Sequence, residues 1–188
     1  MEGRVLKTCV SVQAAGTPLY SGSILRRKRK ALALNPAKTM LSDVYNTRIL
    51  ELAGNIPRLG RLPDADASAT AHSKLCGSTV TIDLKMDGDT VTDFAHDVKA
   101  CALGQASSSI MARNIVGAKA QELRDLREIV RKMLKENGSP PTSGRWADIQ
   151  VLEPVRDYKA RHASTMLTFD AVVDAINQIE ALKVGEKV

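Results

Sequence analysis

The segment STVTIDLKMDGDTVTDFAHDVK, residues 78–99, decides how this chain folds. In its first half every second residue is apolar, and a period of two is typical of a strand that buries one face. The apolar positions are Val80, Ile82, Leu84 and Met86. The pair Asp87-Gly88 favours a two-residue type I′ turn, so the sequence predicts an antiparallel hairpin whose second strand covers about residues 90–99.

A cysteine stands at each end of this hairpin. Cys76 lies just before the first strand, and Cys101 lies just after the second. Because the turn folds both strand ends back to one edge of the sheet, we expect the two cysteines to be close neighbours in space.

The chain on either side of the hairpin is predicted to be mainly helical. Apolar spacings of three and four, and terminating glycines, indicate helices over about residues 42–53, 103–116, 120–137 and 164–182. Residues 64–75 carry no clear pattern and are expected to be irregular. The sequence therefore predicts an α+β domain, a short antiparallel sheet packed against several helices.

Positive charge is concentrated near the N-terminus. Residues 1–39 hold eight basic side chains, five of them in the cluster RRKRK, and one acidic side chain, which leaves 19 basic and 20 acidic residues for the rest of the chain. A nearly neutral folded part argues against a broad nucleic-acid-binding surface. We therefore predict a disordered basic extension over residues 1–39 and a folded domain over residues 40–188.

Three interpretations of the extension compete: an organelle presequence, a nucleic-acid-binding arm, or sequence upstream of a functional start at Met40. The last is favoured because Met40 stands two residues before Ser42, a good helix N-cap. No apolar run approaches the roughly 20 residues that span a membrane, so we expect no membrane association. Three irregularly spaced cysteines do not form a disulfide framework, which indicates a reducing compartment, the cytoplasm.

The position of Cys101 suggests chemistry. The free N–H groups at a helix start stabilise a thiolate, which is a nucleophile and a metal ligand, and the small residues of Ala106–Ser109 would let another group approach. The alternative is a buried cysteine that acts as a small hydrophobic residue. Cys76 and the adjacent Gly77 shift the balance, because two thiols at one sheet end indicate a metal site or a sulfur-handling site, or a disulfide in an oxidising compartment.

A third region of interest precedes the last predicted helix. Arg161, His162 and Ser164 lie together there, and His162 is a potential ligand, an acid–base group or a solvated side chain. Helical residues at positions 162 and 164 would point about 200° apart. Both face one site only if the helix starts near Ser164, with this serine as its N-cap.

Three segments together resemble a known family. CGSTVTIDLKM, ACALGQASSSIMARNIVG and PVRDYKARHASTMLTFDAVVDAI are similar to the NifU/IscU family of iron–sulfur cluster assembly scaffolds, in particular to its SufU-like branch with an insertion. The resemblance implies a SufE/NifU-like α+β fold and a scaffold rather than an enzyme. In this family the cysteines receive sulfur from a cysteine desulfurase, hold zinc, iron or a nascent [2Fe–2S] cluster, and pass the cluster to acceptor proteins.

The family pattern assigns roles to individual residues. Cys76 matches the first ligand and sulfur acceptor, Cys101 matches the second ligand, and Arg161 falls where the family has a basic residue near the third ligand. Two ligand positions differ: Ser78 replaces an aspartate and Ser164 replaces the third cysteine. A hydroxyl is a poor ligand for iron or zinc, so the four-ligand set of a single chain is incomplete.

Three arrangements would compensate for the two serines. His162 is one replacement ligand, since imidazole takes the place of thiolate in some clusters. A homodimer that pairs Cys76 and Cys101 of two chains would supply four thiolates. In the third arrangement the protein holds no stable metal and acts as a persulfide carrier, a sulfurtransferase that works with a cysteine desulfurase.

Overall fold

The computed structural model describes residues 46–185, so the predicted extension, Met40 and Ser42 lie outside the described part. The described elements are α2 (Thr47–Gly54), β1 (Ala67–His72), β2 (Thr79–Asp87), β3 (Thr90–Lys99), α3 (Ala102–Asn114), α4 (Ala120–Lys135), the 3-10 helix η1 (Ala147–Asp157) and α5 (Lys159–Gly185). This set of elements confirms the predicted α+β class. None of the helices within residues 46–185 is both long and apolar enough to cross a bilayer.

The predicted hairpin is present as β2 and β3. Residues Val80, Ile82 and Leu84 of β2 are fully buried, and they face Val98, His96 and Phe94 of β3. The turn differs from the prediction, because its two central residues are Gly88 and Asp89 and only Gly88 has a positive φ, 61°. This is the pattern of a type II′ turn, which places glycine first.

The expectation that residues 64–75 are irregular is wrong. They contain β1, which pairs antiparallel with β2 and completes a sheet of order β1-β2-β3. Ala67, Ala69 and Ala71 of β1 lie opposite Leu84, Ile82 and Val80, on the same face of the sheet. Alanine has a low strand propensity and is only weakly hydrophobic. The alternation of alanines in β1 therefore did not stand out in the sequence as the pattern of a strand. The small side chains leave room for α5, which packs on β1.

Two helix boundaries also differ from the prediction. The first described helix begins at Thr47, where Asn46 is the N-cap and its Oδ1 accepts the N–H of Ile49 at 2.9 Å. The last helix, α5, begins at Lys159 and not near Ser164. The hydroxyl of Ser164 donates to the carbonyl of Arg161 at 3.0 Å, which is the bond of a serine inside a helix rather than of a cap.

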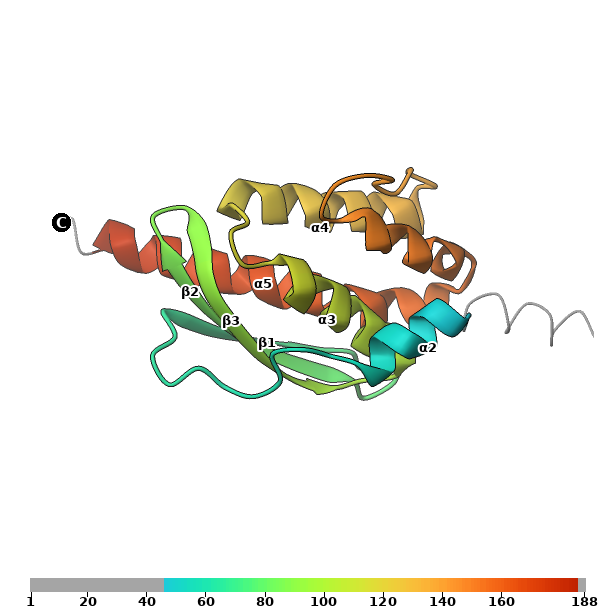
Figure 1. Ribbon diagram of the computed structural model, residues 1–188, viewed down its shortest axis with the longest axis horizontal. Coiled ribbons are helices and arrows are strands. Elements are labelled where there is room, and N and C mark those ends of the chain that lie inside the picture. The colour runs from blue at the N-terminus through green and yellow to red at the C-terminus, as the bar shows by residue number, and fades with distance from the viewer. Residues whose placement is uncertain (1–45, 186–188) are drawn as a thin grey trace, which may run out of the picture. The chain divides into compact units, whose positions relative to one another are not determined.

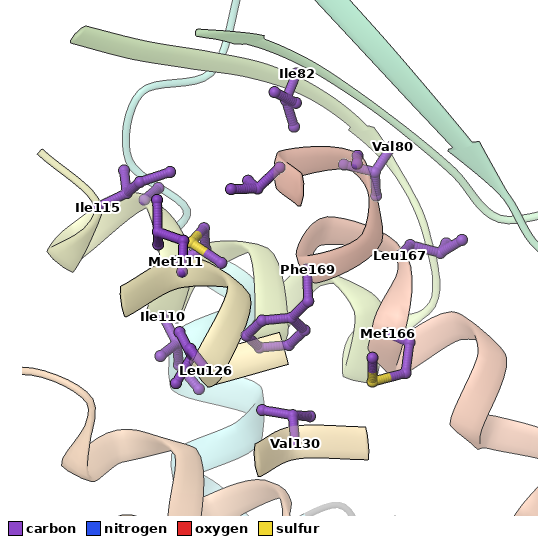
Figure 2. Close-up of a cluster of buried hydrophobic side chains, with 14 of the residues drawn as sticks. Val80, Ile82, Ile110, Met111, Ile115, Leu126, Val130, Met166, Leu167 and Phe169 are labelled. Atoms are coloured by element: carbon purple, nitrogen blue, oxygen red, sulfur yellow. The ribbon is translucent and has the colours of Figure 1, made fainter. Parts of the chain in front are cut away.

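The described part is arranged in layers. Figure 1 shows α3 and α5 lying along the sheet, with α4 and η1 on the side of these helices away from the strands. The core fills the space between the layers, as Figure 2 shows with Val80 of β2, Ile110 of α3, Val130 of α4 and Phe169 of α5. Full burial of one such side chain contributes about 1.5–3 kcal/mol.

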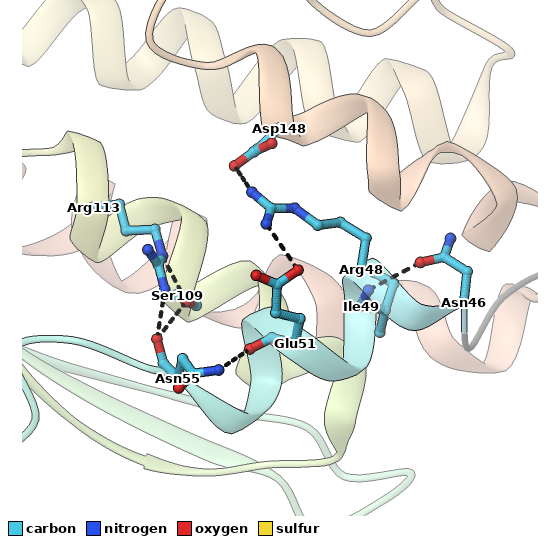
Figure 3. Close-up of polar contacts among 8 residues, drawn as sticks. All are labelled: Asn46, Arg48, Ile49, Glu51, Asn55, Ser109, Arg113 and Asp148. Atoms are coloured by element: carbon cyan, nitrogen blue, oxygen red, sulfur yellow. Dashed lines mark hydrogen bonds and ion pairs between the residues drawn. The ribbon is translucent and has the colours of Figure 1, made fainter.

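The serines of α3 belong to this packed interior. Ser107, Ser108 and Ser109 are at most 1% exposed. Ser109 and Arg113 both donate to the carbonyl of Asn55, at 3.2 and 2.8 Å, and so fix the end of α2 against α3 (Figure 3). The small residues that follow Cys101 therefore serve close packing within this chain.

A second network in Figure 3 attaches α2 to η1. Arg48 of α2 donates to Glu51 in its own helix and to Asp148 of η1, at 3.0 and 2.9 Å. All three side chains are more than a third exposed, so this network contributes little to stability.

Candidate functional site

The sheet brings the two cysteines to one end, as predicted. Thr79 at the start of β2 pairs with Lys99 at the end of β3. The residues just outside this pair, Cys76 and Cys101 among them, therefore lie at the same end of the sheet. Cys76 is exposed and Cys101 is half-buried, and both carry free thiols. Cys76 thus lies at the surface where the hairpin meets α3, and Cys101 lies beside it, packed partly against the core.

A tight turn presents Cys76. The N–H of Gly77 donates to the carbonyl of Ser73 at 2.9 Å, and the N–H of Ser73 donates to the carbonyl of Ser78 at 2.8 Å. Gly77 has φ of 69° and open space where a Cβ would stand, so it supplies the left-handed conformation that the turn requires. These bonds hold the thiol of Cys76 above the start of β2.

Hydroxyl groups surround the Cys76 sulfur. Ser78 Oγ lies 3.0 Å from Cys76 Sγ, and Ser73 Oγ accepts the thiol hydrogen bond at 3.4 Å. The N–H of Cys101 donates to Ser78 Oγ at 3.3 Å, which leaves the hydroxyl hydrogen of Ser78 available for the sulfur. When the thiol loses its proton, the hydroxyls of Ser73 and then Ser78 donate to the sulfur, and this lowers the pKa of Cys76 to about 7 against the opposing effect of desolvation; Ser164 adds to the effect. The lowered pKa raises the share of Cys76 that is a thiolate at neutral pH.

Cys101 stands directly before α3. It is the N-cap, with extended backbone angles (φ −65°, ψ 167°), and its carbonyl accepts the N–H of Gln105 at 2.9 Å. Its side chain does not cap the helix; instead Sγ lies 3.5 Å from the hydroxyl of Ser164 on α5. The predicted location of Cys101 at a helix start is confirmed, and the sulfur points toward the second serine of interest.

Gly104 sets the distance between the two helices at the site. A Cβ atom at position 104 would lie 2.8 Å from the Cβ of Ala100 and 3.0 Å from the carbonyl oxygen of Ser164. Only a glycine allows α5 to come this close to the first turn of α3. Ser164 is fully buried at the contact. Neither Gly104 nor Ser73 was predicted from the sequence to belong to the site. The available signal was their position, since Gly104 stands three residues after Cys101 and Ser73 three residues before Cys76.

The structure does not bring His162 to the two cysteines. Because α5 begins at Lys159, residue 162 is helical and points about 200° away from Ser164. Its Nε2 donates to the carbonyls of Arg156 and Val155, at 2.9 and 3.2 Å. Among the described residues the guanidinium of Arg161 has no hydrogen bond or ion pair, and only its backbone contacts Ser164.

The donor set near this end of the sheet is therefore two thiols and the hydroxyls of Ser73, Ser78 and Ser164. Within residues 46–185 no group of three or more His, Cys, Asp or Glu side chains is arranged to hold a metal ion. Cys76 and Cys101 suit a soft cation, whereas Ser78 and Ser164 stay protonated and are weak donors. One chain alone thus provides two of the four strong ligands that zinc or a [2Fe–2S] cluster takes.

Comparison with known proteins gives a consistent match. Residues 44–165 match the family described as NifU-like N terminal domain. The iron-sulfur cluster assembly scaffold protein IscU of Thermotoga maritima is 26% identical over 136 residues, which cover 72% of this chain and 94% of that protein. The zinc-dependent sulfurtransferase SufU of Bacillus subtilis is 25% identical over 142 residues, or 74% and 94% of the two chains.

Solved structures agree with this match. A nitrogen-fixing NifU-like protein (N-terminal) from Brucella abortus superposes with a TM-score of 0.74 at 67% identity, over 76% of this chain and 98% of that one. A SufU-type scaffold from Fervidobacterium islandicum shares the fold, with a TM-score of 0.66 at 22% identity over 71% of this chain and 97% of that one.

Proposed function

Because this chain belongs to the family of NifU-like N-terminal domains, we propose that it is a scaffold in iron–sulfur cluster assembly. In this role Cys76 and Cys101 bind iron, zinc or a nascent [2Fe–2S] cluster, which is then handed to an acceptor protein. A cysteine desulfurase supplies the sulfur. Both thiols must stay reduced for this chemistry, which fits a reducing compartment such as the cytoplasm.

One observation supports the proposal above all others: the hydroxyl of Ser78 joins the two cysteines. It contacts the sulfur of Cys76 at 3.0 Å and accepts the backbone N–H of Cys101 at 3.3 Å. A soft cation or a sulfur atom bound to Cys76 is thereby held beside the start of α3, where the helix N–H groups favour negative charge.

One chain supplies only two of the four strong ligands of a cluster, so the other two must come from elsewhere. We propose that two chains share one [2Fe–2S] cluster, each through its Cys76 and Cys101, since this gives four thiolates without the two serines. His162 is not part of this arrangement, because its ring nitrogen is bound to the backbone carbonyls of Val155 and Arg156 in η1.

Anaerobic reconstitution with iron and sulfide tests this function. Absorption spectra and metal analysis should show a cluster that is lost in Cys76→Ser and in Cys101→Ser and retained in His162→Ala. The mass of the loaded protein should be that of a dimer. A cluster on a strict monomer would refute sharing between chains, and absence of iron and zinc from the wild-type protein would refute the scaffold function.

A second function is favoured by the low pKa of Cys76, about 7. As a persulfide carrier, the Cys76 thiolate attacks the outer sulfur of a desulfurase persulfide. The S–S bond of the desulfurase breaks, its cysteine leaves as a thiolate, and Cys76 becomes the persulfide. The hydroxyls of Ser73 and Ser78 stabilise the attacking thiolate in this step.

Labelled sulfur distinguishes the two functions. Metal-free protein is incubated with a cysteine desulfurase and labelled cysteine, and the label is located by mass spectrometry. Label on Cys76 in a protein that never acquires metal supports the carrier. Label that is converted into a cluster after iron is added supports the scaffold.

A further inference from the structure

One hydroxyl group joins the two cysteines closely enough for them to react with each other. Ser78 Oγ contacts Cys76 Sγ at 3.0 Å and accepts the N–H of Cys101 at 3.3 Å. Because both contacts share one oxygen atom, the distance between Cys76 Sγ and the backbone nitrogen of Cys101 is no larger than the sum of the two. The sulfur of Cys76 therefore lies beside the backbone of Cys101.

A second hydroxyl is close to both sulfur atoms. Ser164 Oγ lies 3.5 Å from Cys101 Sγ, and the same hydroxyl is one of the groups that lower the pKa of Cys76. Ser164 is fully buried, so its hydroxyl meets the two sulfur atoms from the inner side of the site. The side chain of Cys101 is thus directed to the place where the sulfur of Cys76 also lies.

The two thiols differ in how open they are to other proteins. Cys76 is exposed, and a Cβ atom on the adjacent Gly77 would meet nothing within 4 Å, whereas Cys101 is half-buried and packs partly against the core. A sulfur donor protein therefore reaches Cys76 first. Cys101 carries the only other thiol within residues 46–185, so it is the thiol of the described part that can react with whatever Cys76 carries.

The incomplete ligand set makes this pair available for redox chemistry. Among the described residues no third thiolate or imidazole completes a metal site, so one chain binds a metal ion less tightly than a full set of ligands does. Oxidation of two neighbouring thiols to a disulfide supplies two electrons. Two electrons are also what a sulfane sulfur requires to become sulfide, the form of sulfur in an iron–sulfur cluster.

We propose that Cys101 releases the sulfur carried by Cys76 as sulfide. The starting species is a persulfide anion on Cys76. The sulfur of Cys101 attacks Cys76 Sγ and forms a disulfide with it, while the bond between Cys76 Sγ and the outer sulfur breaks. The outer sulfur leaves with the electron pair of that bond and takes the proton of the Cys101 thiol, so the product is hydrosulfide.

This activity rests on the proposed function for the supply of the persulfide, and it adds a product to that function. Iron or zinc bound by both cysteines would occupy the two thiols, so sulfide is released from the metal-free chain. The disulfide must then be reduced by exchange with an external dithiol before Cys76 accepts another sulfur. The chain is thus a source of sulfide that turns over only in the presence of a dithiol reductant.

Release of labelled sulfide tests this step. Metal-free full-length Cys9→Ser protein, reduced and then freed of reductant, is incubated anaerobically with a cysteine desulfurase and one equivalent of isotope-labelled cysteine. The reaction is quenched with monobromobimane, and labelled sulfide is quantified by mass spectrometry against a blank without this protein. We expect sulfide together with a Cys76–Cys101 disulfide in the peptide map. In Cys9→Ser/Cys101→Ser the label should stay on Cys76, and the sulfide yield should fall at least about tenfold.

A second measurement tests the reach of the two thiols without any sulfur donor. Oxidised glutathione should link Cys76 to Cys101 within one chain of the metal-free protein, at a rate per chain that does not change on dilution. Absence of this link, or a link between two chains in its place, would overturn the proposal.

The sulfide assay also separates failure of this step from failure of the proposed function. Equal sulfide yields from the parent and from the Cys101→Ser variant would overturn the role of Cys101. Label that stays on Cys76 of the parent without sulfide would overturn sulfide release and leave the carrier function intact. Label that never reaches Cys76 would overturn the proposed sulfur transfer, and sulfide release with it.

Discussion

Serine hydroxyls surround the two cysteines, and serine hydroxyls also fill the middle of α3. Near the cysteines, Ser73 and Ser78 lie 3.4 and 3.0 Å from the sulfur of Cys76, and Ser164 lies 3.5 Å from that of Cys101. These hydroxyls can donate to a thiolate, and the pKa of Cys76 is lowered by them. In this region the serines act through their oxygen atoms.

The serines of α3 act through their size. Ser107 donates to the carbonyl of Leu103 in its own helix, Ser109 donates to Asn55, and Ser108 Oγ has no partner among the described residues although it is fully buried. A small side chain at these positions allows close packing, and its hydroxyl forms a hydrogen bond where an acceptor lies within reach. The same residue type thus has a chemical role at the sheet end and a packing role in the helix.

The sharpest contrast between the two regions is expected for metal affinity. Ser164→Cys adds a third thiol beside Cys101, and the zinc affinity of the chain should rise at least about a hundredfold, because thiolate binds zinc far better than a neutral hydroxyl. Competition with a chromophoric chelator measures this. The matched variant Ser107→Cys adds a thiol in α3 and should leave zinc affinity unchanged. Equal gains in both would show that position 164 is not a ligand position.

Gly104 links the two regions, so its substitution should cost the most stability. Gly104→Val forces side-chain atoms against Ala100 and the Ser164 carbonyl, and should lower the free energy of unfolding by about 2–3 kcal/mol. Urea denaturation followed by circular dichroism measures the loss. Gly54→Val is the control, because its Cβ meets nothing within 4 Å, and it should change stability by less than about 0.5 kcal/mol. Similar losses for both would contradict the close helix approach.

The hydroxyls at the sheet end should control thiol reactivity. In metal-free protein the rate of Cys76 alkylation by iodoacetamide should rise with pH and reach half its maximum at about pH 7. In Ser73→Ala/Ser78→Ala the pKa of Cys76 returns toward its ordinary value, so the rate at pH 7 should fall about tenfold. Peptide mass spectrometry assigns the label to Cys76. An unchanged pH profile would rule out thiolate stabilisation by these serines, and Ser107→Ala should have no effect.

The smallest expected effect is a gain in stability within α3. Ser108→Ala removes a buried hydroxyl without a partner and should raise the free energy of unfolding by about 0.5–1 kcal/mol, whereas Ser107→Ala removes a bonded hydroxyl and should not raise it. Thermal unfolding compares the two variants. A loss of stability in Ser108→Ala would indicate that this hydroxyl makes a favourable contact after all.

The local sequence pattern was enough to predict the hairpin and the closeness of the two cysteines. The alternation of apolar and polar residues in β2, together with a turn that contains glycine, places Cys76 and Cys101 at the same end of the sheet. The third strand was missed because the alanines of β1 carry no strong strand preference and pair only once β2 is present. The start of α5 was missed because Ser164 suits a cap equally well as a helix interior.

The sequence by itself determined the α+β class and the two thiols at one end of the sheet, because these follow from short-range periodicity and residue identity. Only the tertiary structure decided that Gly104 lets α5 approach α3, that the hydroxyl of Ser78 joins the two cysteines, and that His162 faces away from them. Such choices depend on how separate elements pack, and because α5 starts five residues earlier than predicted, residue 162 is helical and points about 200° away from residue 164.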